Sequence, residues 1–124
     1  MAKPPKIRNG GTWTEAGFWG RVRSHLRRMF RFNWVPARLA LERARRPYVG
    51  ENKRQKWEFQ CAFCHKWFLR KGVELDHIRP CGSLNSWEDV RPFMERLLCE
   101  SPDDYAVLCK SCHKEKTDEE RGIG

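Results

Sequence analysis

The sequence predicts an α+β fold, in which a small domain is built around four cysteines and preceded by a basic helical N-terminal extension. Two Cys-x-x-Cys pairs with 44 residues between them can bring four thiols together: Cys61 with Cys64, and Cys109 with Cys112. The 124 residues are 40% hydrophobic, which suits one modest core. The charge is uneven, because residues 1–56 carry 15 Lys and Arg against three acids, whereas residues 57–124 carry 10 against 13.

Composition and charge narrow the class of protein. No apolar run approaches membrane-spanning length, and the charged N-terminus has no signal-peptide core, so we expect an intracellular, cytoplasmic protein without a membrane partner. In a reducing compartment the six cysteines are expected to be metal ligands or buried thiols rather than disulfides. The net charge of +12 over residues 1–56 favours a polyanion, and nucleic acid is the commonest one inside a cell.

Residues 1–56 are expected to form a basic helical extension that contacts nucleic acid. After a mobile lead-in over residues 1–11, Thr12-Trp13-Thr14-Glu15 matches the capping box that begins a helix. Pro36 suits the start of a second helix through Arg46, and a linker is expected over residues 47–52. Apolar residues recur at helical spacing in the first helix: Phe18, Val22, Leu26 and Met29 or Phe30. Its remaining surface carries five arginines that we expect to contact phosphates: Arg21, Arg23, Arg27, Arg28 and Arg31.

Residues 57–124 are expected to form the cysteine-bearing domain. Trp57–Gln60 and Lys66–Leu69 predict a β-hairpin around the first cysteine pair. Four further elements are predicted from apolar patterns and N-cap residues: a strand over 73–76 that ends beside His77, a helix from Ser86 to about Cys99, a strand over 106–108, and a surface helix over 110–120.

The four paired cysteines predict a structural zinc site. A Cys-x-x-Cys turn lets two sulfurs reach one ion, and a second pair completes a tetrahedral shell with no open position. Cys81 and Cys99 lack this spacing, so we expect them to be packed thiols.

Asp76, His77 and His113 lie next to these fixed elements. Asp76 and His113 supply an oxygen and an imidazole donor, which together can hold a second divalent ion with positions left for water and phosphate. Neighbouring side chains on a strand point to opposite faces, so only one of Asp76 and His77 need face the ion. The other is free to act as a base.

The combination of these motifs resembles the HNH endonucleases, the zinc-stabilised branch of the ββα-metal nucleases. The motifs are Cys-x-x-Cys, then Glu-Leu-Asp-His-Ile at 74–78, then Leu-Cys-x-Ser-Cys-His-x-x-Lys-Thr at 108–117, and they span about half of the chain. The resemblance implies a ββα-metal (HNH) core that grips one catalytic ion, such as Mg²⁺, Mn²⁺ or Ni²⁺. It also implies that Asp76 and His113 hold this ion, that His77 is the general base, and that the products carry 5′-phosphate and 3′-hydroxyl ends.

Two features depart from the family pattern. Asp104 stands where the family has its middle Asn, and its carboxylate can accept a hydrogen bond from His77 and raise its basicity but cannot donate one. The segment 82–101 is long for a minimal hairpin and is expected to contain an inserted helix. Arg79 and Lys116 are the candidate phosphate contacts of this domain.

The sequence leaves two main hypotheses. One is a metal-dependent DNA endonuclease similar to small bacteriophage proteins, with phage packaging or replication proteins as candidate partners. The other is a non-catalytic zinc-knuckle module that binds nucleic acid or a polymerase, which the Asp at position 104 favours. A zinc deaminase is set aside because neither cysteine pair follows a Pro, as the Pro-Cys-x-x-Cys motif of that class requires. DNA or RNA preference and oligomeric state stay open.

Overall fold

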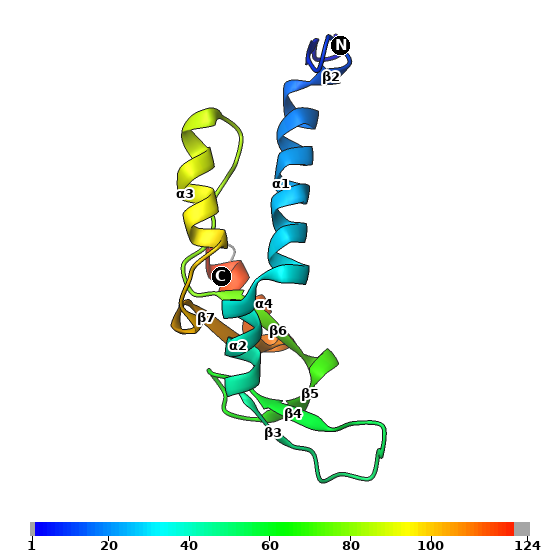
Figure 1. The fold of residues 1–124 in the computed structure, drawn as a ribbon, viewed down its shortest axis with the longest axis vertical. Helices are drawn as coiled ribbons and strands as arrows, with labels where there is room; N and C mark the ends of the chain where they lie inside the picture. The colour runs from blue at the N-terminus through cyan, green and yellow to red at the C-terminus, as the bar shows by residue number, and fades with distance from the viewer. Residues whose placement is uncertain (1, 121–124) are drawn as a thin grey trace. The chain divides into compact units, whose positions relative to one another are not determined.

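The computed structural model describes residues 2–120, which contain both helices and small antiparallel sheets (Figure 1), so the α+β class predicted from the sequence is confirmed. Four α-helices lie in these residues: α1 (Glu15–Asn33), α2 (Val35–Arg43), α3 (Trp87–Leu97) and α4 (Lys110–Glu120). The same residues form three sheets: β1 (Lys6–Arg8) with β2 (Trp13–Thr14); β3 (Arg45–Pro47) with β4 (Trp57–Gln60) and β5 (Trp67–Leu69); and β6 (Val73–His77) with β7 (Tyr105–Cys109). No helix in the described part of the chain is long and apolar enough to cross a membrane.

The chain forms two compact units that interleave along the sequence. Among the described residues, unit 1 comprises residues 2–34 and 79–99, and unit 2 comprises residues 35–78 and 100–120. These units do not coincide with the segments 1–56 and 57–124 that the charge distribution suggests. The expected insertion over 82–101 contains α3, which packs in unit 1, whereas α2 and β3 belong with the cysteine-bearing strands of unit 2. The functional division of the two expected segments stays a prediction.

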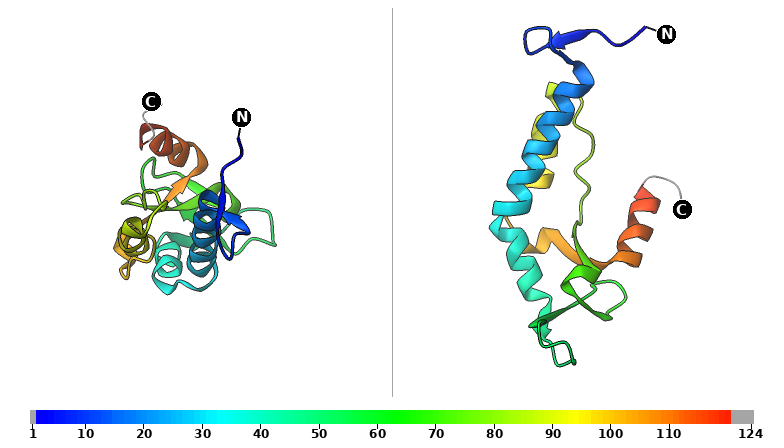
Figure 2. Two further views of the ribbon diagram at one scale, coloured as in Figure 1. Left: turned by 90° about the horizontal axis from the view of Figure 1, so that it is seen from above. Right: turned by 90° about the vertical axis from the view of Figure 1, so that its right-hand side faces the viewer.

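Unit 1 is held together by an aromatic core between α1 and α3, which run side by side (Figures 1 and 2). Trp19 is 1% exposed and packs with Leu84, Phe93 and Leu97. The four-residue spacing of one helix face turns these apolar side chains of α1 towards the same core: Phe18, Val22, Leu26 and Phe30. The apolar stripe expected in the first helix is therefore confirmed, except that Met29 is exposed.

The helix α1 begins two residues later than the capping box predicts. Its N-cap is Thr14, whose hydroxyl accepts a hydrogen bond from the Gly17 N–H at 3.0 Å. Thr12 instead donates its hydroxyl to the carbonyl of Asn9 at 2.7 Å, within a turn that has positive φ at residues 9–11. This turn folds β1 back onto β2, so the segment 1–11, expected to be a mobile lead-in, contains a paired strand.

In unit 2 the first cysteine pair lies in the connection between two strands of a three-stranded sheet. The strands β4 and β5 form the hairpin predicted from the sequence, with Phe59 opposite Phe68. The second helix was expected through Arg46, but α2 ends at Arg43 because residues 45–47 pair with β4 as β3. The expected linker therefore begins inside a strand. Arg45 and Arg46 lie over the rings of Trp57 and Trp67, with the guanidinium carbon 4.0 and 3.8 Å from the ring centroids.

The strands β6 and β7 pair in antiparallel register, and α4 packs against both. Asp76 lies opposite Ala106, and His77 lies opposite Tyr105. Because side chains alternate along a strand, Val73 and Val107 face the core together with Phe59 of β4. Glu74 and Asp76 therefore point to the other face, where α4 lies.

Candidate metal centres

The four paired cysteines converge on one point in unit 2. Their four Sγ atoms all lie within 4.8 Å of one another, and the Sγ atoms of Cys64 and Cys109 are 4.0 Å apart. A tetrahedral ion with metal–sulfur bonds of about 2.3 Å holds its sulfurs about 3.8 Å apart, so the cluster has the size that zinc requires. Cys61 and Cys109 are buried, and Cys64 and Cys112 are partly exposed. The four cysteines can therefore bind a metal such as zinc.

Backbone geometry prepares both cysteine turns for a cation. The N–H of Cys64 donates to the Sγ of Cys61, and the N–H of Cys112 donates to the Sγ of Cys109, each at 3.5 Å. Burial raises the pKa of the Cys61 thiol, but backbone N–H groups directed at its sulfur outweigh burial and hold the pKa at about 6. Loss of water and the neighbouring thiols raise the pKa of Cys112 to about 12. A divalent cation supplies the positive charge that lets all four thiols ionise together.

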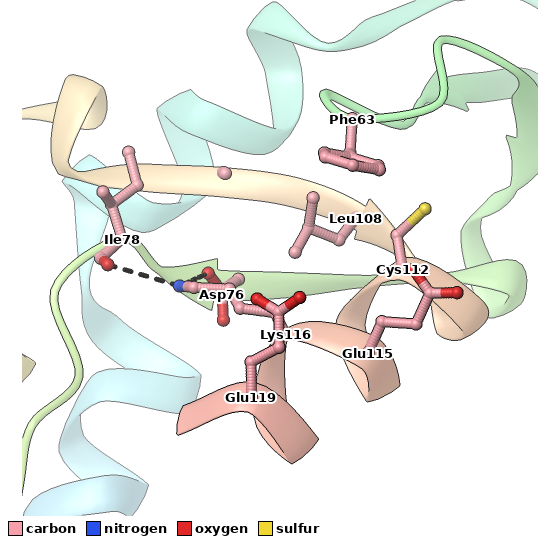
Figure 3. Close-up of a pocket in the computed structure, with 9 residues that line it drawn as sticks. Phe63, Asp76, Ile78, Leu108, Cys112, Glu115, Lys116 and Glu119 are labelled. Atoms are coloured by element: carbon pink, nitrogen blue, oxygen red, sulfur yellow. Dashed lines mark hydrogen bonds and ion pairs between the residues drawn. The ribbon is translucent and has the colours of Figure 1, made fainter. Parts of the chain in front are cut away.

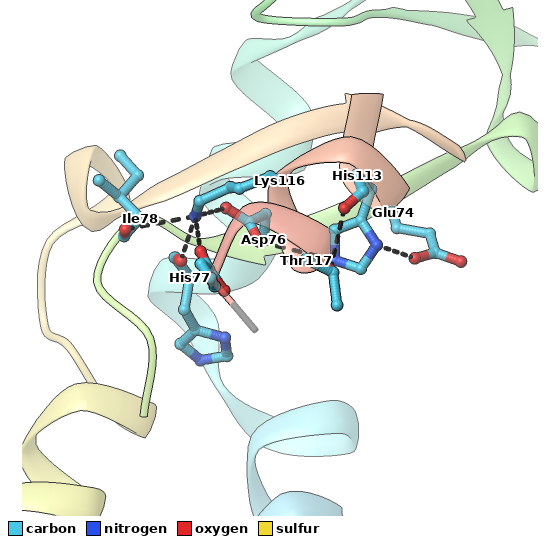
Figure 4. Close-up of polar contacts among 8 residues, drawn as sticks. Glu74, Asp76, His77, Ile78, His113, Lys116 and Thr117 are labelled. Carbon is cyan, nitrogen blue, oxygen red and sulfur yellow. Dashed lines mark hydrogen bonds and ion pairs between the residues drawn. The ribbon is translucent and has the colours of Figure 1, made fainter. Parts of the chain in front are cut away.

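A second group of possible ligands lies between β6 and α4, at Asp76 and His113 (Figure 4). The Nε2 atom of His113 is 3.5 Å from the Oδ1 atom of Asp76. The other ring nitrogen, Nδ1, is 2.8 Å from the Oε2 atom of Glu74. In the neutral imidazole, a proton on Nδ1 can be donated to Glu74, and the lone pair of Nε2 is then available to a cation on the side of Asp76. The strand and the helix thus bring an oxygen donor and a nitrogen donor close together, and their binding of an ion stays a prediction.

Lys116 holds the second oxygen of the Asp76 carboxylate. Its ammonium contacts Asp76 Oδ2 and also donates to the carbonyls of His77 at 2.9 Å and Ile78 at 3.3 Å. Burial lowers the pKa of Lys116, but its contacts with Asp76 and Glu120 outweigh burial and raise that pKa above its ordinary value. The ammonium therefore stays charged. The buried carboxylate of Asp76 contacts Lys116 through Oδ2 and faces His113 through Oδ1.

His77 points away from this group, on the opposite face of β6 (Figure 4). Its ring meets the ring of Tyr105 edge to face, with 5.2 Å between the centroids. Asp104 lies directly before Tyr105 in a 3₁₀ turn, Pro102–Asp104, with its side chain exposed. Its backbone carbonyl accepts a hydrogen bond from the N–H of Ile78 at 3.1 Å, which closes the end of the two-stranded sheet. The pairing of the Asp104 carboxylate with His77 stays a prediction.

The arginines predicted to contact nucleic acid lie in unit 1. Three of those on α1 lie over aromatic rings: Arg21 over Trp13, Arg27 over Phe93 and Arg31 over Phe32. Arg23 donates to the carbonyl of Leu84 at 2.7 Å, so it also fastens α1 to the segment before α3. Arg28 and Arg79 are exposed. Their contact with nucleic acid stays a prediction.

Sequence reasoning missed the part played by Glu74. It lies two residues before Asp76 and therefore on the same face of β6. That alternation was a signal in the sequence. It could not identify the partner, because His113 is 39 residues further along the chain and reaches Glu74 only through the packing of α4 on β6.

Comparison with known proteins identifies the family of this chain. Over 77 residues it is 36% identical to a protein of Lactococcus phage SK1 described as a probable HNH endonuclease. The matched region covers 61% of this chain and 73% of the phage protein. No family model matches the chain, and no solved structure matches it. The resemblance read from the cysteine, Asp-His and Cys-His motifs is thus confirmed, and the chain belongs to the HNH endonuclease family.

Proposed function

We propose that the protein is a metal-dependent endonuclease that hydrolyses DNA phosphodiester bonds. The observation that carries this proposal is the close approach of Asp76 and His113, 3.5 Å apart, with the imidazole oriented by Glu74. A carboxylate beside a metal-binding histidine is a common arrangement in metalloenzymes, because it fixes the ring and makes it a stronger ligand. The family of the chain and its phage relative support the same reaction class.

The donor set fits a divalent cation that accepts oxygen and nitrogen ligands, such as Mg²⁺, Mn²⁺ or Ni²⁺. Asp76 and His113 would hold it, and two protein ligands leave positions for water and a phosphate oxygen. When bound, such an ion supplies Lewis-acid stabilisation of the charge that develops on the phosphate and the leaving oxygen. Lys116 restrains the Asp76 carboxylate, so one oxygen stays directed to the His113 side.

We assign removal of the proton from the attacking water to His77. The strand β6 ends at His77. A phosphate bound beyond this end can therefore be reached from both faces of β6, by Asp76 on one face and by His77 on the other. In this proposal Asp104 accepts a hydrogen bond from His77 and stabilises the imidazolium that forms. Lys116 offsets charge near the phosphate, and Arg79 binds a neighbouring phosphate of the same strand.

The other assignments concern folding and DNA binding. The four cysteines hold a structural zinc, because a four-thiolate shell has no open position for substrate. Residues 1–56 act as a DNA-contacting arm, in which the arginines of α1 bind phosphates without reading bases. If the protein is phage-encoded, it works in the host cytoplasm beside packaging or replication proteins.

One observation favours a second candidate, a zinc-knuckle module that binds nucleic acid without cutting it. The ammonium of Lys116 already supplies a positive charge to the Asp76 carboxylate. Together with an Asp at position 104, this arrangement is also compatible with a site that takes up no second cation.

A supercoiled-plasmid assay tests the proposal. Purified zinc-loaded protein is incubated with Mg²⁺ or Mn²⁺, and His77→Ala is compared with wild type and with the control His25→Ala, whose histidine is exposed on α1. We expect nicked or linear DNA from wild type and from the control. His77→Ala should cut about 10²- to 10⁴-fold more slowly, the usual contribution of a general base. Zinc content and DNA affinity should be unchanged in both variants.

The opposite result separates the two candidates. If wild type binds DNA tightly but yields no product in any divalent metal, the binding module is correct. If His77→Ala cuts as fast as wild type, the protein is a nuclease whose base is another residue.

A further inference from the structure

A cavity of about 300 Å³ opens directly beside Asp76 and Lys116 in unit 2 (Figure 3). Its floor is formed by Ala106 and Leu108 of β7, on the sheet face that also carries Asp76. Phe63 and Ile78 also line this cavity. The cavity is therefore apolar over most of its lining, although it adjoins the ion pair of Asp76 and Lys116.

Phe63 is a large apolar residue that lies at the surface. It lies between the two cysteines of the first knuckle, and its side chain is 71% exposed. Ile78, at the end of β6, is 52% exposed. Exposed apolar side chains that line one pocket commonly mark a binding site, whereas isolated ones need no explanation. The knuckle turn also holds the backbone of Phe63 in place, so little conformational freedom is lost when a ligand binds there.

We propose that this cavity binds an unstacked nucleobase of the DNA strand, next to the phosphate held at Asp76 and His113. This inference rests on the proposed function and adds the part of the substrate that lies beside the cut. A nucleotide carries its base within one sugar of its phosphate, so a phosphate at the Asp76 group brings a base to the cavity. The ring of Phe63 offers the face on which such a base stacks, and stacking on aromatic side chains is how proteins hold single bases.

The charges at the rim favour a base over the DNA backbone. Glu115 and Glu119 of α4 also line the cavity, with Glu115 drawn beside Cys112 (Figure 3). Two carboxylates repel a phosphate, but they accept hydrogen bonds from the amino groups of adenine, cytosine or guanine. Thymine has no amino group, so it should occupy the cavity less well than the other three bases.

A double-mutant cycle tests the base site by combining removal of one base from the DNA with removal of the Phe63 ring from the protein. Oligonucleotides with one abasic nucleotide are scanned through every position, and their affinity is measured in Ca²⁺ with a His77→Ala background, so no cutting is required. At one position we expect the missing base to weaken binding by about 5- to 100-fold, the usual value of one stacked base. The same abasic change should cost nothing in Phe63→Ala, because the partner ring is already absent.

Two further variants show that the ring is responsible. Phe63→Leu keeps an apolar side chain and should lose most of the coupling, whereas Phe63→Trp should retain it. Val49→Ala removes an apolar side chain of unit 2 that is 89% exposed and lies outside the cavity, and it should leave the coupling unchanged. Zinc content confirms that each variant is folded.

The outcomes of the base test and of the cutting assay are distinct. If wild type cuts DNA but no abasic position couples to Phe63, the base site is wrong and the nuclease stands. If coupling is found in a protein that never cuts, the base site stands and the binding module replaces the nuclease. Equal affinity of all four bases at the coupled position would overturn the role of Glu115 and Glu119.

Discussion

The four-cysteine cluster and the Asp76–His113 pair differ in almost every property that decides what a metal site does. The cluster is closed by four sulfurs, two of them on buried residues. The pair offers one oxygen and one nitrogen, and the His113 side chain is 30% exposed. The two groups are nevertheless joined, because Cys112 and His113 are consecutive residues in the first turn of α4. We therefore predict that the cysteine cluster positions the Asp76–His113 pair, so that loss of the cluster disturbs the pair but loss of the pair leaves the cluster intact.

The strongest test of this dependence is Cys61→Ser. We expect loss of zinc and unfolding of unit 2, because metal binding in such small sites is also folding free energy. Zinc content and hydrogen exchange over residues 35–78 and 100–120 measure the effect. The control is Cys99→Ser, since Cys99 lies outside the cluster and donates to carbonyls at the end of α3. A Cys61→Ser protein that keeps its zinc and its exchange protection would contradict the structural role.

Asp76→Asn should break the open site alone. The neutral amide is a poor ligand, so we expect Mn²⁺ affinity to fall by more than about 100-fold, the upper range for residues that only support a ligand. Cutting should be lost while the zinc is retained. Some loss of stability is also expected, because Lys116 would keep Glu120 but lose Asp76, the anionic partner at its partly buried position. Titration calorimetry with Mn²⁺ measures the affinity, and loss of zinc in this variant would show that the two sites are not separable.

Substitution of Glu74 should also lower Mn²⁺ affinity, but by less than Asp76→Asn does. Glu74→Ala removes the acceptor for His113 Nδ1, and we expect Mn²⁺ affinity to fall by about 10- to 100-fold. Glu74→Gln keeps an acceptor oxygen without the charge and should fall between that variant and wild type. Glu95→Ala is a matched control, because Glu95 is an exposed carboxylate of unit 1 that pairs with Arg91. An unchanged affinity in Glu74→Ala would mean that this carboxylate does not orient the histidine.

The two metal groups also show how far the sequence could predict the structure. The cysteine cluster follows from spacing alone, since each pair is closed by a short turn. Local patterns likewise predict the hairpin around Cys61, the strand to Asp76 and the helix α4. The contacts of Glu74 and Lys116 could not be predicted, because each joins β6 to α4 across about 40 residues and depends on which face of the helix packs inwards.

The division of the chain into two units could not be predicted from the sequence either, because it also depends on contacts between distant residues. Residues 79–99 follow β6 directly, so the sequence suggests an insertion in the cysteine-bearing domain. Their place in unit 1 depends on the packing of Phe93 and Leu84 around Trp19, more than 60 residues away in sequence. Hydrophobic contacts of this range carry no local signature. The N-cap of α1 differs from the predicted one for a local reason. Thr12 and Thr14 are both good N-cap residues, and the turn at residues 9–11 decides between them because it engages the hydroxyl of Thr12.

The smallest predicted effect separates DNA binding from both metal groups. Arg28 is exposed on α1, so Arg28→Ala should weaken DNA affinity modestly and lower the slope of log affinity against log salt by about one, the value of one phosphate contact. Zinc content and Mn²⁺ affinity should not change. Arg23→Ala should behave differently, because Arg23 also donates to the carbonyl of Leu84 and its loss should lower the stability of unit 1. If Arg28→Ala left the salt slope unchanged while Arg23→Ala destabilised unit 1, the arginines of α1 would serve the fold rather than the DNA, and unit 2 would have to bind its substrate without them.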